Sequence, residues 1–228
     1  MGLCGLLHFA RTILMKAELL SHFGDDLMVV NAARVSYGKS KGVLDEKDSR
    51  LIRFLVDHGH TSPFRHPQLQ FRIQCPIFVE RQLFKHQVGL TANSISGRYV
   101  DFSDEYWIPE QLRSQSKDSK QGSSGDLDAT DNMHFLTRMN CLISQCKELY
   151  EDMVAAGVAK EQCRIILPLC LETQFIWTGS LAAFLHMWKL RLKPDTQKET
   201  RDVALMMLEC VKSIPGEPFK MTMEAFGL

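Results

Sequence analysis

The sequence predicts a globular fold that mixes β-strands with α-helices and has a helical second half. Apolar and polar side chains alternate over residues 69–74, which is the pattern of a half-buried strand. Between residues 131 and 156, apolar side chains recur at helical spacing, and Gly157 follows as a stop signal. The chain has 228 residues, of which 45% are hydrophobic and 24% charged, so it can bury a sizeable core.

Caps, breakers and apolar spacing predict five further elements in the first half. In chain order they are an edge strand over residues 13–20, a helix over 27–35 capped by Asp25 or Asp26, a helix that follows Asp45 or Asp48 and ends at Gly59, a helix from Pro76 to about residue 86, and an extended segment over 94–102.

Residues 113–131 contain almost no apolar side chains and are expected to form a surface loop. Four more elements are predicted after the long helix. They are a short helix through Cys163 and Arg164 that ends before Pro168, a strand or extended connection over 172–177, a helix from a Ser180 cap to about residue 192 that Pro194 breaks, and a last helix from Asp195 to about residue 212.

The composition excludes several classes of function. The formal net charge is zero, so we expect neither nucleic acid nor a membrane surface as a partner. Seven cysteines at irregular spacing, without a Cys-x-x-Cys pair, argue against a disulfide framework and a structural zinc site. No signal peptide or apolar run of the length of a spanning helix is evident, so a cytoplasmic protein is expected.

Residues 85–99 form the most informative stretch, and we interpret them as a nucleotide site. Lys85, His86 and Gln87 follow a predicted helix, and a Ser-Gly-Arg-Tyr run begins at Ser96. Arginine suits bidentate binding of phosphate, and glycine lets the backbone approach a ligand closely. If residues 94–102 are extended, Ser94, Ser96 and Arg98 point the same way, and the helix end and the strand could present Gln82, Lys85, Ser96 and Arg98 to one pocket. The simpler alternative is a set of basic groups that stabilise a helix C-terminus.

Three other features carry candidate chemistry. His58–His66 holds three histidines in nine residues, and a ligand-contacting turn is favoured there over a metal site. Arg164 interrupts an apolar run, where a structural ion pair is the alternative to ligand binding. Arg191 ends an aromatic-rich helix, where a surface arginine at the helix C-terminus is the alternative. No Gly-x-x-x-x-Gly-Lys loop, Gly-x-Gly-x-x-Gly fingerprint or Gly-x-Ser-x-Gly elbow occurs, and no metal is expected.

Taken together, these motifs resemble those of the flavin-dependent thymidylate synthases, the thymidylate synthase-complementing protein family. The family signature is an Arg-His-Arg triplet followed by Ser and soon by Arg-Tyr. Four further segments match family motifs in order. They are Ala32–Tyr37, His58–Phe64, Arg164–Pro168, and Arg191 with Thr196–Glu199.

The resemblance implies an α+β fold, with a mixed β-sheet flanked by helices in a single domain over residues 1–228, including an N-terminal extension over 1–12. It implies reductive methylation of dUMP to dTMP, with methylenetetrahydrofolate as carbon donor and FAD reduced by NADPH as hydride carrier. It also implies a homotetramer whose sites are shared between subunits.

The family pattern assigns two sets of binding residues. Those around dUMP are Gln82, Lys85, Ser94, Ile95, Ser96, Gly97, Arg98, Arg164 and Arg191. Those around FAD are His60, Ser62, Lys85, His86, Gln87, Ser94, Ser180, Ala182 and His186. Arg191 and Ser96 are the candidate catalytic residues. A binding role is favoured for Ser96, because no base stands beside it in the sequence.

Within this resemblance, Arg98 and Arg164 can neutralise the 5′-phosphate of dUMP, and Arg191 can stabilise negative charge that develops on the uracil.

Four positions depart from the family pattern. Lys85 and Gln87 replace the two arginines of the triplet, Ser94 stands where many members have Glu, and Ala182 stands where many have Arg. A homologue that binds nucleotide and flavin but turns over weakly is therefore an alternative. A nucleic-acid-binding module is disfavoured by the zero net charge.

Overall fold

The computed structural model of the chain describes residues 14–99, 105–117 and 122–228. They divide into two compact units. The sheet unit comprises Lys16–Ile73, Gln82–Asn93 and Phe175–Leu228, and the long-helix unit is built mainly from Gln74–Arg81 and Ser94–Gln174. The expectation of a single domain stays a prediction. No helix among the described residues is both long and apolar enough to cross a bilayer.

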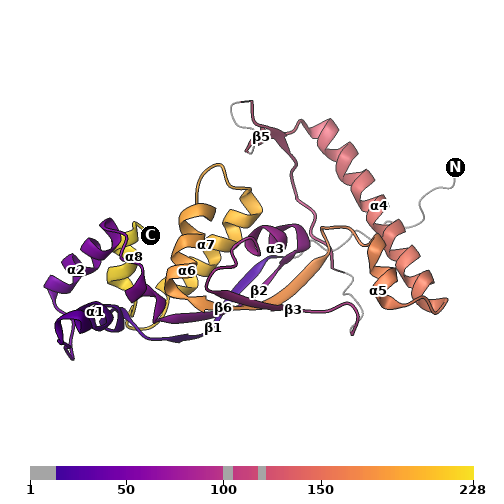
Figure 1. Cartoon of the computed structure of the whole chain (residues 1–228). Coiled ribbons are helices and arrows are strands. Elements are labelled where there is room, and N and C mark those ends of the chain that lie inside the picture. The colour runs from indigo at the N-terminus through magenta and orange to yellow at the C-terminus, as the bar shows by residue number, and fades with distance from the viewer. Residues whose placement is uncertain (1–13, 100–104, 118–121) are drawn as a thin grey trace. The chain divides into compact units, whose positions relative to one another are not determined.

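Four strands form one sheet, in the order β1-β2-β6-β3 (Figure 1). The strands are β1 (Lys16–Phe23), β2 (Gln68–Pro76), β3 (Leu90–Ser94) and β6 (Glu172–Ser180). The predicted edge strand is confirmed as β1, although it begins and ends later than expected. The alternating strand is confirmed as β2, because Leu69, Phe71 and Ile73 are buried. Together with the helices below, the sheet confirms the α+β class.

Helices α6 (Leu181–Arg191) and α7 (Lys198–Lys212) supply much of the core of the sheet unit. The Ser180 hydroxyl accepts a hydrogen bond from Ala183 N at 3.3 Å and so caps α6 as predicted. Trp188 is buried and donates from Nε1 to Ala204 O at 3.0 Å, which ties α6 to α7. Helix α7 packs against β1.

Two glycines let the start of α6 lie very close to the turn before β3. Gly89 adopts φ +75°, and its carbonyl accepts a hydrogen bond from Ser180 N at 3.2 Å. A Cβ at Gly179 would overlap this carbonyl oxygen and lie 3.2 Å from Leu90 Cα. Only glycine fits at position 179, and its absence of a side chain brings Ser180 next to the turn that follows Gln87.

Side-chain caps begin the first two helices of the sheet unit, as the sequence predicts. Asp25 caps α1 (Asp26–Arg34) by accepting from Met28 N at 2.8 Å. Asp45 caps α2 (Glu46–Asp57) within a capping box that Asp48 completes. Gly59 has φ +69°, which suits the predicted stop after α2.

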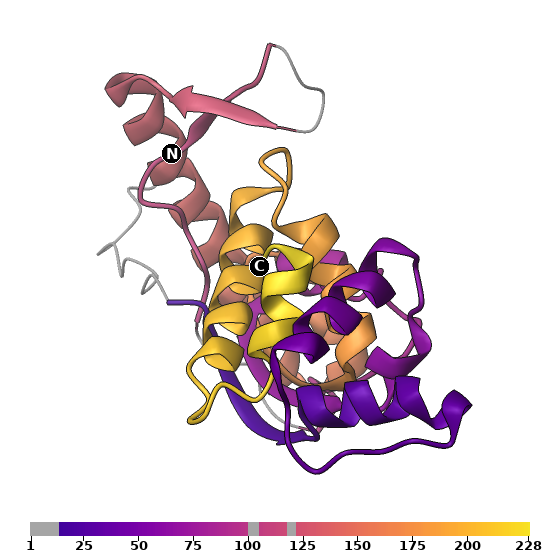
Figure 2. The same cartoon turned by 90° about the vertical axis from the view of Figure 1, so that its left-hand side faces the viewer.

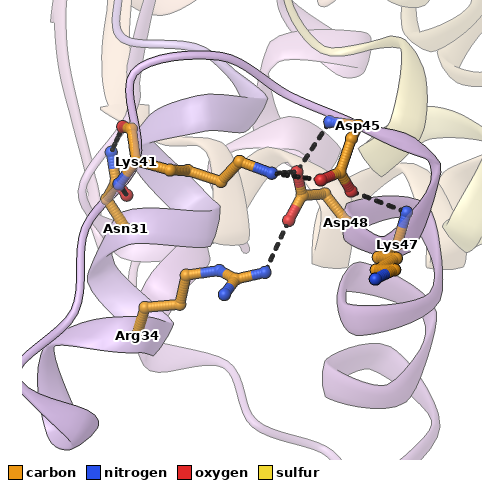
Figure 3. Close-up of polar contacts among 6 residues, drawn as sticks. All are labelled: Asn31, Arg34, Lys41, Asp45, Lys47 and Asp48. Carbon is orange, nitrogen blue, oxygen red and sulfur yellow. Dashed lines mark hydrogen bonds and ion pairs between the residues drawn. The ribbon is translucent and has the colours of Figure 1, made fainter.

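The connection between α1 and α2 is held by a buried carboxylate (Figure 3). Asp48 is fully buried and pairs with Arg34 Nη2 at 2.9 Å and Lys41 Nζ at 2.6 Å. It also accepts from Asp45 N at 2.8 Å. Burial opposes ionisation, but these hydrogen bonds prevail and keep the pKa of Asp48 below its usual range. Asn31 fixes the same loop through both backbone groups of Lys41.

A last helix, α8 (Lys220–Phe226), was not predicted from the sequence. It packs against α2, and the two lie side by side in Figure 2, where α8 is yellow and α2 dark purple. Asp26 anchors it by accepting from Thr222 Oγ1 at 2.5 Å and from Met221 N at 2.7 Å. Burial raises the pKa of Asp26 to about 6, although these hydrogen bonds act in the opposite direction.

We therefore expect a pH-dependent stability that Asp26→Asn removes. The folded pKa of about 6 exceeds the usual value of 3.8, so the folded protein binds this proton more tightly than the unfolded chain. The contribution of Asp26 is present below about pH 4 and is lost as the pH rises through about 6. Urea unfolding of wild type and Asp26→Asn over that range measures it. Parallel pH profiles for the two proteins would contradict the assignment.

The long-helix unit contains helices α4 (Ala129–Ala155) and α5 (Lys160–Cys163), followed by a 3₁₀ turn at Arg164–Ile166. The predicted long helix is confirmed as α4, and Gly157 follows it with φ +81°. A small core lies in this unit. It consists of Tyr106, Ile108, Ile143 and Leu171, with Ile77, Leu136, Leu167 and Cys170 packed against it.

The expected surface loop over 113–131 is wrong in part. It contains an antiparallel hairpin, β4 (Arg113–Gln115) with β5 (Ser123–Asp126), and the first residues of α4. The sequence shows no apolar alternation here because the described residues of this hairpin are largely exposed. Hydrogen bonds hold it, such as that from Arg113 Nε to Ser123 Oγ at 2.9 Å.

Two helix boundaries also differ from expectation. Helix α3 (Ile77–Leu83) ends three residues early, because Lys85 N and His86 N bond three residues back, to Gln82 O at 3.3 Å and Leu83 O at 3.0 Å. Helix α7 starts at Lys198 rather than Asp195, because Thr196 N bonds to Lys193 O at 3.0 Å in a turn that contains Pro194.

The extended segment expected over 94–102 is also wrong where the structure describes it. Strand β3 ends at Ser94, and Tyr99 N closes a turn on Ser96 O at 3.0 Å. Ser94, Ser96 and Arg98 therefore do not follow strand alternation. Residues 100–102 lie outside the described part of the chain. Strand β6, in contrast, runs three residues beyond the expected 172–177.

Candidate functional site

Arg191, the last residue of α6, lies at the centre of a polar cluster in the sheet unit. Its Nε donates to His86 Nε2 at 2.9 Å, and its Nη2 donates to Gln82 O at 3.1 Å. The side chain is half-buried, and this burial lowers the pKa of Arg191 from its usual value. The alternative of a solvated surface arginine is therefore not what the structure shows.

His86 can accept this bond only while it is neutral. Burial, followed by the charge of Arg191 and by His186, lowers the pKa of His86 to about 4. At neutral pH the proton of the ring must lie on Nδ1, since Nε2 accepts from Arg191. His186, also on α6, meets the His86 ring edge to face with centroids 6.0 Å apart.

Gln82, in the last turn of α3, is held by residues from the start of α7. Its side-chain Nε2 donates to Gln197 Oε1, and its side-chain Oε1 accepts from Thr200 Oγ1 at 3.0 Å. Gln197 in turn donates to Glu199 Oε2 at 3.0 Å, and both Glu199 and Thr200 are buried. Gln197 and Thr200 were not predicted as site residues. Gln197 lies within the Thr196–Glu199 family motif, to which the resemblance assigns no ligand contact.

A second feature of the sheet unit is a pocket of ≈ 340 Å³ beside the start of α6. Three predicted FAD residues, His60, Ala182 and His186, line it. Lys189 also lines it and was missed, although it lies one turn after His186 on the same helix. The remaining walls are mainly apolar and come from α2, α6, α8 and the 3₁₀ turn Ser62–Arg65, with Leu55, Val56, Phe64, Leu185 and Phe226 among them.

The other residues predicted around FAD in this unit lie near these features without lining the pocket. Ser180 caps α6, and Ser62 is exposed at the start of the 3₁₀ turn Ser62–Arg65. Lys85 and Gln87 are exposed on the turn that leads to Gly89.

The histidines of the segment His58–His66 have separate surroundings. His58 stacks on Phe54 with centroids 4.0 Å apart, His60 lines the pocket, and His66 is exposed. Within residues 14–99, 105–117 and 122–228, no group of three or more His, Cys, Asp or Glu side chains could hold a metal ion.

The remaining predicted dUMP residues belong to the long-helix unit. Ile95 N donates to Gln174 O at 2.9 Å, which fixes the start of the turn that contains Ser96 and Gly97. Arg98 is exposed, and its guanidinium lies over the Tyr99 ring, 5.3 Å from the centroid.

Arg164 is exposed and donates to Glu161 O at 3.4 Å. Its charge therefore stays in contact with solvent, and the free-energy cost of burying a charge, expected from the apolar residues around it in the sequence, does not arise.

Glu80 is a further residue that the sequence did not single out. Ser94 donates to its Oε1 at 2.6 Å, so a carboxylate contacts the position where many family members have Glu. Burial raises the pKa of Glu80, and the bond from Ser94 acts against that rise. No local pattern could have found it, because Glu80 lies on α3, fourteen residues before Ser94.

Comparison with known proteins supports the family resemblance. The family described as thymidylate synthase complementing protein matches residues 18–215. A flavin-dependent thymidylate synthase from Thermus thermophilus is 40% identical over 195 residues, which cover 86% of this chain and 70% of the relative. One from Kosmotoga olearia is 38% identical over 196 residues, with 86% and 84% covered.

The fold also matches solved structures. The crystal structure of the UMP/dUMP methylase PolB from Streptomyces cacaoi bound with 5-Br dUMP superposes with a TM-score of 0.84 at 27% sequence identity, and the match covers 95% of this chain and 96% of that chain. The chain is thus an enzyme of the methyltransferase class, and it belongs to the thymidylate synthase complementing protein family, the flavin-dependent thymidylate synthases.

Proposed function

We propose that this protein converts dUMP to dTMP by reductive methylation, with methylenetetrahydrofolate as the carbon donor and FAD reduced by NADPH as the hydride carrier. The observation that carries the proposal is the half-buried Arg191, which His86 and Gln82 hold in place within a family member. The related methylase bound with 5-Br dUMP supports the choice of nucleotide. A homotetramer that shares its sites remains part of the proposal.

The pocket of the sheet unit fits part of a flavin cofactor. It joins apolar walls to a few polar groups, His60, His186 and Lys189, as small-molecule pockets commonly do. The ammonium of Lys189 and the imidazoles can pair with phosphate or with polar edges of a ring. When bound, the reduced flavin supplies the hydride, and the protein binds and orients it.

Arg191 is the residue that we expect to act on the reacting base. Its Nε and Nη2 are occupied by His86 and Gln82, and no partner is found for Nη1 among the described residues. A guanidinium fixed in this way can stabilise negative charge that develops on a uracil ring without first reorganising. Arg98 and Arg164 are exposed and can neutralise the 5′-phosphate of dUMP.

A catalytically weak homologue is the second candidate. Ala182 lines the pocket without a charge, and both Lys85 and Gln87 are exposed where the family signature has arginines. One experiment separates the two candidates. Purified protein is supplied with dUMP, methylenetetrahydrofolate, NADPH and FAD, and dTMP is measured. A yellow protein that binds dUMP but forms no dTMP would favour the weak homologue.

Lys189→Ala tests the assignment of the flavin pocket. We expect the Kd for FAD to rise about tenfold, since a hydrogen bond to a charged group contributes about 1.5–3 kcal/mol. Flavin fluorescence quenching during titration measures this Kd. Lys193→Ala is the matched control, because Lys193 is exposed beyond the end of α6 and does not line the pocket. Equal FAD affinity in both variants would exclude Lys189 from the cofactor site.

A further inference from the structure

The pair formed by His86 and Arg191 joins residues 105 positions apart in the chain. Arg191 is held at two points, since Nε bonds to His86 and Nη2 bonds to a backbone carbonyl, Gln82 O. Two contacts on different nitrogens fix the plane of a guanidinium, whereas one leaves it free to swing. Gln82 O is a backbone atom at the end of α3, so no side-chain substitution removes it. The bond to His86 is therefore the contact that a mutation can remove.

Only the neutral form of His86 can pair with Arg191. A neutral imidazole accepts from Arg191, whereas a protonated one has no acceptor and repels the guanidinium. The titratable groups that act on His86 are Arg191 and His186, both on α6, and both oppose its protonation together with burial. Lys85, next to His86 in the chain, is exposed. His86 therefore stays an acceptor throughout the neutral range.

We propose that His86 is a positioning residue for Arg191, and that its contribution to dUMP binding passes through the orientation of that guanidinium. This inference rests on the proposed function for its substrate. It assigns His86 a task beyond contact with flavin. His186 lines the pocket and its ring meets that of His86, which in turn bonds to Arg191, so one pair of imidazoles connects the pocket with the arginine.

A double-mutant cycle tests the proposal with FAD-loaded protein at neutral pH. The variants are His86→Phe, Arg191→Ala, the double variant, and His86→Gln, whose side-chain oxygen can accept from Arg191. The Kd for dUMP is measured by calorimetry, and thermal melts check folding. We expect His86→Phe to weaken binding about tenfold, and His86→Gln to recover most of that loss. In the Arg191→Ala background, His86→Phe should change Kd less than about twofold.

An equal loss from His86→Phe in both backgrounds would overturn the proposal, because His86 would then act on the ligand directly or through the flavin. Failure of His86→Gln to recover binding in a folded protein would also overturn it.

A ligand-free measurement separates this inference from the proposed function. Nitrogen-15 NMR of the histidine side chains should show Nε2 of His86 unprotonated at neutral pH. In Arg191→Ala, the pKa of His86 should rise from about 4 toward its usual range. If that shift is seen but wild type does not bind dUMP, only the proposed function fails. If dUMP binds normally and His86 titrates alike in both proteins, the positioning role fails alone.

Discussion

Arg191→Ala is expected to lower the kcat/KM for dTMP formation about a hundred- to a thousandfold while the protein remains folded. Removal of one fixed donor that stabilises charge in a transition state typically costs about 2.7–4 kcal/mol. The fold should persist, because Arg191 is the last residue of α6 and its side chain is only half-buried. The measurement combines steady-state dTMP formation with circular dichroism.

Arg50→Ala is the matched control, because Arg50 is an exposed arginine on α2 in the same unit. Its turnover should equal that of wild type. Arg191→Lys should retain the charge but lose the bond to His86, and so fall between wild type and alanine. Wild-type turnover in Arg191→Ala would refute the role assigned to the guanidinium.

Asp48→Ala should produce the largest loss of stability, about 3–5 kcal/mol in the free energy of unfolding. The carboxylate is fully buried and accepts hydrogen bonds from Arg34 and Lys41, so its removal leaves these cations around an unfilled site (Figure 3). Urea unfolding measures the effect. Glu18→Ala is the control, because the pair of Glu18 with Arg72 is exposed and should contribute less than about 1 kcal/mol.

Asp48→Asn adds a test by pH. The folded pKa of Asp48 is lowered, so its contribution to stability is present above the usual carboxyl range and is lost as the pH falls through the folded pKa. Wild type should therefore lose stability in acid relative to Asp48→Asn. A difference between the two proteins that does not change with pH would show that the ion pairs contribute little.

Local signals were enough to predict most of the secondary structure. Asp25, Asp45 and Ser180 act as caps because each accepts a backbone N–H two or three residues ahead. Burial on one side of β2 follows from alternation within the strand itself. The family motifs are likewise read residue by residue, so membership of the family can be inferred from the amino-acid sequence alone.

Two elements, helix α8 and the hairpin of β4 and β5, could not be predicted from the sequence. Helix α8 has no side-chain cap at its N-terminus and is anchored there by Asp26, 195 residues before Met221 in the chain. The hairpin of β4 and β5 buries little apolar surface, so no hydrophobic pattern marks it. The anchor of α8 is distant in the chain, and the hairpin is held by polar contacts across about ten residues, so side-chain periodicity reveals neither.

For the candidate site, too, the sequence reveals one part and only the tertiary structure decides the other. The residue types around Arg191 were recognisable from motifs, but the contacts were not. The bond from Arg191 to His86 spans 105 positions and that from Thr200 to Gln82 spans 118. The pocket that brings Lys189 to His60 likewise depends on how α2, α6 and α8 pack. Periodicity and capping act within a few residues, whereas the partner of a buried polar group depends on the path of the whole chain.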